Sequence, residues 1–170
     1  MSLFFNYEVA SDESDAPVAL SWCEADSILA VSYASKQIKF YQAAGELLPD
    51  TVSKSSTPVC LSWKPASKIL AIGWSDGIVS LWNHTERMSR EDAFIHRSAI
   101  TFLQWSPDGS RLVSGDESGT VGVWKTDPRG RLISICNYRK KGKFTHCVLM
   151  TQHICQGRLI RKKFKPMNAN

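Results

Sequence analysis

Apolar residues lie along this chain in short runs, separated by turns rich in Pro, Gly, Asp and Ser. The segment WSPDGSRLVSGDESGTVGVW, at 105–124, shows an apolar run, a turn, a second run, a tight turn and a third run. Proline and glycine fall in the turns rather than in the runs, as the hydrogen bonding of a β-sheet requires. Helical periodicity is not sustained over as many as about 11 residues. The pattern predicts an all-β chain.

This arrangement occurs three times, at 18–41, 59–82 and 100–124. An aromatic residue ends the first run of each copy and another closes the third run, and both series keep a spacing of 41 and then 42 residues. The two series are Trp22, Trp63 and Trp105, and Tyr41, Trp82 and Trp124. A period of about 40–45 residues with several short strands is typical of the blades of a β-propeller.

The repeats predict an incomplete propeller, with about three blades and the first strand of a fourth. We expect the partial propeller to span 1–149, with blades near 18–48, 59–95 and 100–136 and a fourth that starts at 144. GELL (45–48) and RLISIC (131–136) are the candidates for outer strands. Residues 150–170 lack a turn, a central strand and a closing aromatic residue, so we expect a disordered basic tail there.

The three copies resemble WD-repeats. Blades of that family commonly carry a hydrogen-bonded set, which consists of a His before the first strand, a Ser or Thr on the central strand, an Asp in the tight turn and the closing Trp. The resemblance places His96, Ser114 and Trp124 in this set in the third copy, with Ser118 at the place of the Asp.

The other two copies match the set less well. The second has Asp76 and Trp82 but Lys54 and Ser55 where the His would lie, and the first keeps only Tyr41. The resemblance therefore implies an incomplete set in every blade, with a cost of about 1–3 kcal/mol for each buried polar group left unpaired.

A narrower resemblance rests on the Trp in the first strand of all three copies. Together with MSLFFNYEVASD, LSWKPASKILAIGWSDG and LQWSPDGSRLVSGDESG, this series resembles the amino-terminal propeller of the intraflagellar transport protein 140 family, the large scaffold subunits of ciliary transport complex A. The resemblance implies a non-catalytic interaction module for retrograde transport and cilium assembly. Its partners would be other complex A subunits, in the cytoplasm, the cilium and the ciliary basal body.

Charge is divided unevenly along the chain. Residues 1–127 hold all 16 acidic residues and 10 Lys and Arg, whereas 128–170 hold 11 Lys and Arg and no acid. The tail could therefore bind nucleic acid or anionic lipid, although a solvated face is the simpler interpretation. Its sequence departs from the family, and an early stop is the expected reason. Two further alternatives are a generic WD-repeat adaptor and a truncated product without independent function.

Catalytic and metal-binding motifs are weak in this sequence. It contains no phosphate-binding glycine loop, and His96 with Asp92 and Ser98 resembles ordinary loop composition more than a catalytic triad. Potential zinc ligands cluster near the end of the chain, at Cys136, His146, Cys147, His153 and Cys155, but their spacing fits no common structural zinc site. We therefore expect no enzyme activity, no cofactor, no metal and no small-molecule substrate.

Composition is compatible with this interpretation. The length of 170 residues and a hydrophobic content of 43% suit one domain with a packed core. No apolar stretch approaches the roughly 20 residues that a membrane-spanning helix needs. Five cysteines at irregular spacing indicate reduced thiols rather than a disulfide framework.

Overall fold

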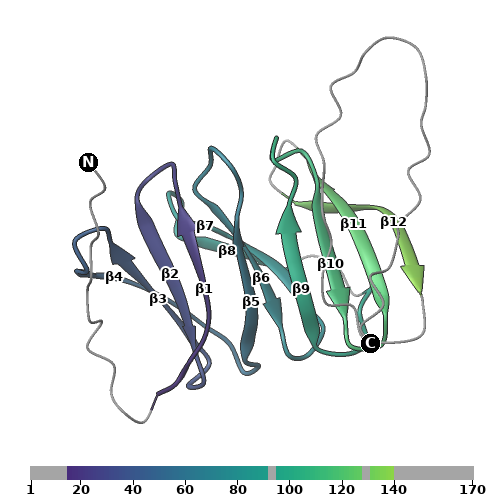
Figure 1. Cartoon of the computed structure of the whole chain (residues 1–170), viewed down its shortest axis with the longest axis horizontal. Helices are drawn as coiled ribbons and strands as arrows, with labels where there is room; N and C mark the ends of the chain where they lie inside the picture. The colour runs from purple at the N-terminus through teal and green to yellow at the C-terminus, as the bar shows by residue number, and fades with distance from the viewer. Residues whose placement is uncertain (1–14, 92–94, 128–130, 140–170) are drawn as a thin grey trace, which may run out of the picture.

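The structure, a computed structural model, describes residues 15–91, 95–127 and 131–139. These residues form twelve β-strands and no helix, arranged as three four-stranded antiparallel sheets that we call blades 1, 2 and 3 (Figure 1). Blade 1 comprises β1 (Pro17–Cys23), β2 (Ile28–Tyr33), β3 (Gln37–Gln42) and β4 (Leu47–Ser53). Blade 2 comprises β5 (Pro58–Trp63), β6 (Ile69–Trp74), β7 (Val79–Asn83) and β8 (Met88–Glu91). Blade 3 comprises β9 (Ile100–Trp105), β10 (Leu112–Asp116), β11 (Thr120–Thr126) and β12 (Leu132–Arg139).

Strands follow one another in sequence order across each blade, because every strand pairs with the next through a short turn. The blades stand side by side, with β1 packed on β5 and β5 on β9 (Figure 1). The three sheets form an arc rather than a closed ring. This arrangement confirms the predicted all-β, incomplete propeller.

The tight turn between the second and third strand of each blade contains a residue in the left-handed region. Glycine occupies that position in blades 2 and 3, at Gly77 (φ 87°) and Gly119 (φ 84°), whereas blade 1 has Lys36 (φ 68°). Glycine has no Cβ to clash in this conformation, so the sequences SDG and ESG form the turn without strain. The N–H of each of these residues bonds back to the last residue of the preceding strand.

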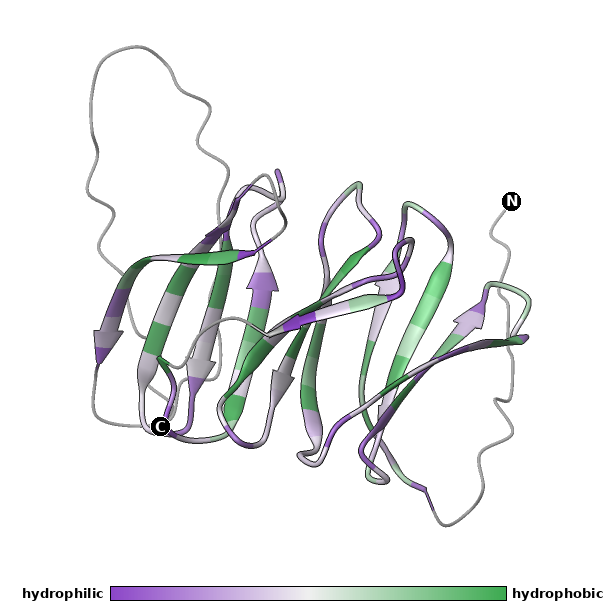
Figure 2. Ribbon diagram, turned by 180° about the vertical axis from the view of Figure 1, so that it is seen from behind, coloured by the Kyte–Doolittle hydropathy of each residue, from purple (hydrophilic) through white to green (hydrophobic). Residues whose placement is uncertain are grey.

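Apolar side chains from neighbouring blades meet in two cores. Figure 2 shows that the strands of all three blades carry hydrophobic residues. Between blades 1 and 2, the Phe40 ring packs near Trp63 and Trp82, with ring centroids 6.1 and 6.2 Å away. Between blades 2 and 3, Trp105 and Trp124 pack against the β6–β7 hairpin. Burial of a Trp at about 25 cal/mol per Å² contributes several kcal/mol, so these interblade cores hold the blades together.

Outer strands differ in position from the sequence expectation. β4 begins at Leu47 and runs on to Ser53, beyond GELL, because Gly45, with a φ of 85°, and Glu46 belong to the turn that starts at Gln42. β12 starts at Leu132, one residue after the predicted start, and ends at Arg139. The fourth blade expected at 144 and the tail expected at 150–170 lie outside the described residues.

Candidate functional site

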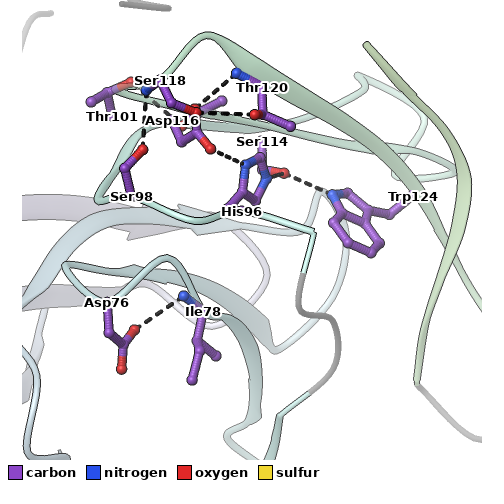
Figure 3. Close-up of polar contacts among 11 residues, drawn as sticks. Asp76, Ile78, His96, Ser98, Thr101, Ser114, Asp116, Ser118, Thr120 and Trp124 are labelled. Atoms are coloured by element: carbon purple, nitrogen blue, oxygen red, sulfur yellow. Dashed lines mark hydrogen bonds and ion pairs between the residues drawn. The ribbon is translucent and has the colours of Figure 1, made fainter. Parts of the chain in front are cut away.

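A chain of buried polar side chains runs through blade 3 (Figure 3). Trp124 Nε1 donates to Ser114 Oγ at 2.8 Å, and Ser114 Oγ lies 2.7 Å from His96 Nε2. On the other side of the imidazole ring, His96 Nδ1 lies 3.1 Å from Asp116 Oδ2. The network ties the closing Trp to the central strand, to the loop before β9 and to the end of β10.

Asp116 was not among the residues expected in this network. Ser118 does occupy the turn position of the family Asp, but Asp116 supplies the carboxylate from two residues earlier, and Ser118 Oγ donates to it at 2.8 Å. The backbone N–H of Thr120 donates to the same carboxylate, also at 2.8 Å. The expectation that every blade has an incomplete hydrogen-bonded set is therefore wrong for blade 3, which has the His, the Ser, the carboxylate and the closing Trp.

Proton positions in the network follow from the chemistry of its members. Burial raises the pKa of the Asp116 carboxyl, but hydrogen bonds from Ser118, Thr120 and His96 outweigh burial and hold that pKa below its ordinary value. An ionised carboxylate only accepts, so His96 Nδ1 carries the proton. Burial lowers the pKa of His96 despite Asp116, so the ring is neutral and Ser114 donates to its Nε2.

The Asp116–His96–Ser114 order resembles that of a catalytic triad, but its environment does not. The side chains of His96 and Asp116 have no exposed surface, and Ser114 is fully buried. Ser114 Oγ is also engaged by Trp124 Nε1, which leaves it no open approach to a substrate. Of the alternative triad considered above, Ser98 Oγ accepts from the backbone of Ser118, and Asp92 lies outside the described residues. The network is structural.

Close packing of the Trp124 indole depends on Gly122, its neighbour two residues earlier on β11. A Cβ at Gly122 would lie 2.9 Å from Trp124 Nε1. Real Cβ atoms do not approach other atoms so closely, and the indole is held in place by Ser114. The glycine in TVGVW therefore makes room for the ring that the network uses.

Blade 2 fills the equivalent positions differently. Lys54 takes the place of the His and forms an ion pair with Asp76, at 3.5 Å from its Oδ2, while the ammonium lies 5.4 Å from the centre of the Trp74 ring. Ile72, which pairs with Ser80 on β7, occupies the position in blade 2 that Ser114 occupies in blade 3. As a result, the buried Trp82 Nε1 has no hydrogen-bond partner among the described residues, whereas Trp74 Nε1 donates to Ser80 Oγ at 2.7 Å.

Blade 1 uses two tyrosines. Tyr33 is the register equivalent of Asp116, and Tyr41 is that of Trp124. Their hydroxyl oxygens lie 2.8 Å apart in a buried hydrogen bond. Burial and this bond raise the pKa of Tyr33, so its phenol stays protonated at neutral pH.

First-strand tryptophans join one blade to the next. Trp63 Nε1 donates to the backbone oxygen of Ser21 at 3.1 Å, and Trp105 Nε1 donates to that of Ser62 at the same distance. Both acceptors precede the Trp of the preceding blade. Trp22 lies in the first of the described blades and is 46% exposed, against 7% for Trp63.

A rim hollow of about 530 Å³ lies between blades 1 and 2. Its walls come from the β1–β2 turn, the β3–β4 turn, the strands next to these turns and the residue that follows β7. The lining residues are Asp26, Ser27, Ile28, Gln42, Ala43, Ala44, Leu48 and His84. Part of the segment CEADS (23–27), which contains the β1–β2 turn, thus forms a wall of this hollow. No feature of the sequence pattern indicated the concavity itself.

The residues that the structure describes form neither a metal-ligand cluster nor a membrane-spanning helix. Within 15–91, 95–127 and 131–139, no three His, Cys, Asp or Glu side chains are grouped so as to hold a metal ion. Four of the five potential zinc ligands (146, 147, 153 and 155) lie outside those ranges. The same ranges contain no helix long and apolar enough to cross a membrane.

Three sheets packed face to face, with the Trp124–Ser114–His96–Asp116 set in one of them, define a β-propeller of the WD-repeat class. Within this class, the sequence profile of the IFT140 first β-propeller matches residues 2–160, and the chain belongs to that family.

Other comparisons found similarity to shorter stretches of curated proteins and to one solved structure. A stretch of 52 residues, 31% of this chain and 12% of the relative, is 36% identical to DDB1- and CUL4-associated factor 13 of Dictyostelium discoideum. A stretch of 49 residues, 29% of this chain and 4% of the relative, is 37% identical to apoptotic protease-activating factor 1 of Danio rerio. A chain in the crystal structure of the mitotic checkpoint complex superposes with a TM-score of 0.62 and 22% identity, over 75% of this chain and 40% of that one. That likeness shows the shared fold.

Proposed function

We propose that the chain serves as a non-catalytic protein-interaction segment of the intraflagellar transport complex A scaffold, in retrograde ciliary transport and cilium assembly. The family match over 2–160 carries this proposal. The structure supports an interaction role, because its polar network is sealed in blade 3 and its rims present exposed turns. Rigid blades that hold exposed loops are suited to binding other proteins. The expected locations are the cytoplasm, the cilium and the basal body.

Binding to purified complex A subunits tests the proposal. The 170-residue chain would be immobilised and offered each subunit in turn, with a folded propeller of another WD-repeat protein as the control. We expect the chain to retain at least one subunit that the control does not retain. Failure to retain any complex A subunit, together with a diffuse distribution of the tagged chain in ciliated cells, would contradict the proposal.

A second candidate function rests on charge, because residues 128–170 hold 11 Lys and Arg and no acidic residue. Binding to nucleic acid or to anionic lipid through this segment would weaken steeply as salt rises from about 50 to 200 mM, since counterions are displaced from the phosphates. Docking between protein subunits has a much weaker dependence on salt. A steep salt slope, removed by deletion of 150–170, would favour this second function over the scaffold role.

A further inference from the structure

The outer strand of each blade pairs on one side only with another described strand. Such an edge presents a row of backbone N–H and C=O groups that can pair with a further strand. β4 contains Pro49, which has no N–H to donate, and β8 has only four residues. β12 has eight residues and contains neither Pro nor Gly. It is therefore the outer edge that can best accept another strand.

Apolar side chains are exposed in the middle of β12. Ile133 is 41% exposed and Ile135 is 45% exposed, and neither belongs to the two interblade cores. Leu132, by contrast, is buried in the core between blades 2 and 3 and anchors the start of the strand. β12 lies at the opposite end of the arc from blade 1 (Figure 1). A strand added here would gain apolar contacts as well as backbone hydrogen bonds.

Positive charge surrounds this apolar centre. Arg131 precedes β12 and Arg139 ends it, and both are exposed, whereas 132–138 contain no charged residue. Residues 125–139 carry four Lys and Arg and one acid, Asp127. The Asp127 side chain is only 10% exposed and is bonded to Arg131 at 3.0 Å. The edge is therefore apolar in the middle and cationic at its ends.

This charge pattern selects among possible occupants. A second copy of the chain does not fit, because antiparallel pairing of two β12 strands would bring the arginines of one copy against those of the other. Nucleic acid fits poorly as well, because 132–138 offer no cation to a phosphate backbone. An extended segment with acidic ends complements both the arginines and the isoleucines.

We propose that β12 binds an extended, acidic segment of a partner protein, which adds a fifth strand to blade 3. Main-chain hydrogen bonds would hold the segment, as in other cases of β-strand addition. β-branched residues at its centre would contact Ile133 and Ile135, and acidic residues at its ends would pair with Arg131 and Arg139. A segment of eight residues spans about 27 Å, enough to reach both arginines. The inference deepens the proposed function by naming the kind of segment that docks.

Peptide binding by the ¹⁵N-labelled 170-residue chain tests this inference without any complex A subunit, so it can fail separately from the proposed function. The probe is acetyl-Glu-Glu-Val-Thr-Val-Thr-Glu-Glu-amide. We expect saturable shifts of the backbone amide signals of Ser134, Ile135 and Cys136. Alternate amides of 133–137 should also become protected from hydrogen exchange, because they join a new ladder. The signal of Thr51, in the outer strand of blade 1, should not move.

Two modified peptides separate strand pairing from simple charge attraction. The first has N-methyl groups on its four central residues, which removes the N–H donors from both edges while keeping the charge. The second has Lys in place of every Glu, which keeps the edges and reverses the charge. Neither should shift or protect the β12 amides.

A pair of charge reversals provides the matched test on the chain itself. Arg139→Glu should weaken binding of the acidic peptide about fivefold, because an exposed ion pair is replaced by a repulsion. Arg90→Glu makes the same change of net charge in the outer strand of blade 2 and should leave binding unchanged. Dispersed amide signals outside β12 show whether each variant is folded.

Four results would overturn the inference. These are no shift at β12 with the acidic peptide, equal effects of the N-methylated or the Lys peptide, equal weakening by Arg139→Glu and Arg90→Glu, and larger shifts of the β12 signals with an RNA of six uridines than with the acidic peptide. The last result would assign the edge to nucleic acid instead.

Discussion

Replacement of Ser114 by Ala is the sharpest test of the blade 3 network. Ser114 Oγ is bonded to two buried groups, Trp124 Nε1 at 2.8 Å and His96 Nε2 at 2.7 Å. The substitution leaves both groups without their partner, and neither is accessible to water. At about 1–3 kcal/mol for each stranded group, we expect a loss of about 3 kcal/mol in the free energy of unfolding. That is a large part of the roughly 5–15 kcal/mol typical of a domain.

Ser80→Ala in blade 2 provides the matched control. Ser80 is fully buried like Ser114, but its Oγ accepts a bond from only one indole, that of Trp74, at 2.7 Å. The control should therefore cost about half as much, about 1–2 kcal/mol. Both variants remove one oxygen atom from a serine on the strands of a blade, so the size of the cavity that they leave is the same.

Urea unfolding followed by tryptophan fluorescence and by far-ultraviolet circular dichroism measures both variants. A double-mutant cycle with Trp124→Phe should show a coupling energy of about 1–2 kcal/mol between positions 114 and 124. The network account would be refuted if Ser114→Ala cost no more than Ser80→Ala, or if the cycle gave no coupling.

Three further predictions concern other parts of the fold. Gly122→Ala should destabilise the chain by about 1–3 kcal/mol in urea, because its Cβ would lie 2.9 Å from Trp124 Nε1, and a neutral result would contradict the packing described. The pKa of His96 is lowered from 6.5, so the stability that its neutral form contributes is complete above pH 6.5 and is lost as pH falls toward the lowered pKa. The free energy of unfolding, measured between about pH 7.5 and 5.5, should fall with pH in this way, and His96→Gln should reduce the slope. Trp63→Phe and Trp105→Phe should each cost about 1–2 kcal/mol through loss of the bond to the preceding blade, whereas Trp22→Phe should change stability by less than about 0.5 kcal/mol, and equal effects would contradict the cross-blade role.

Aromatic spacing was sufficient to predict the blades, because two residues per blade face fixed directions and repeat with the fold. Trp63 and Trp105 lie in equivalent positions and make the same bond, as a constant period requires. The tight turns of blades 2 and 3 could also be predicted from the sequence, since Gly77 and Gly119 supply the residue in the left-handed region. Outer strands were placed less well, because β4 carries Pro49 and polar residues that do not stand out from a loop.

Asp116 was missed because the family pattern places the carboxylate at one position of the tight turn and does not consider its distance from the imidazole. A carboxylate at the end of β10 reaches the same imidazole, and the local signal was present in the order Ser114, Asp116, Ser118. The rim hollow was missed for a different reason. Its walls come from the β1–β2 turn, the β3–β4 turn and His84 of blade 2, and a sequence pattern does not show that these separate segments lie together.

Hydrogen exchange of the six indole N–H groups tests the central claim that these strands are successive blades joined by their tryptophans. The indole signals of a ¹⁵N-labelled chain report each residue separately. We predict strong protection for Trp63, Trp74, Trp105 and Trp124, which donate to identified acceptors, and for Trp82, which is buried. Trp22, at 46% exposure, should exchange fastest. Protection of Trp22 equal to that of Trp63 and Trp105, or rapid exchange of all three, would contradict the account.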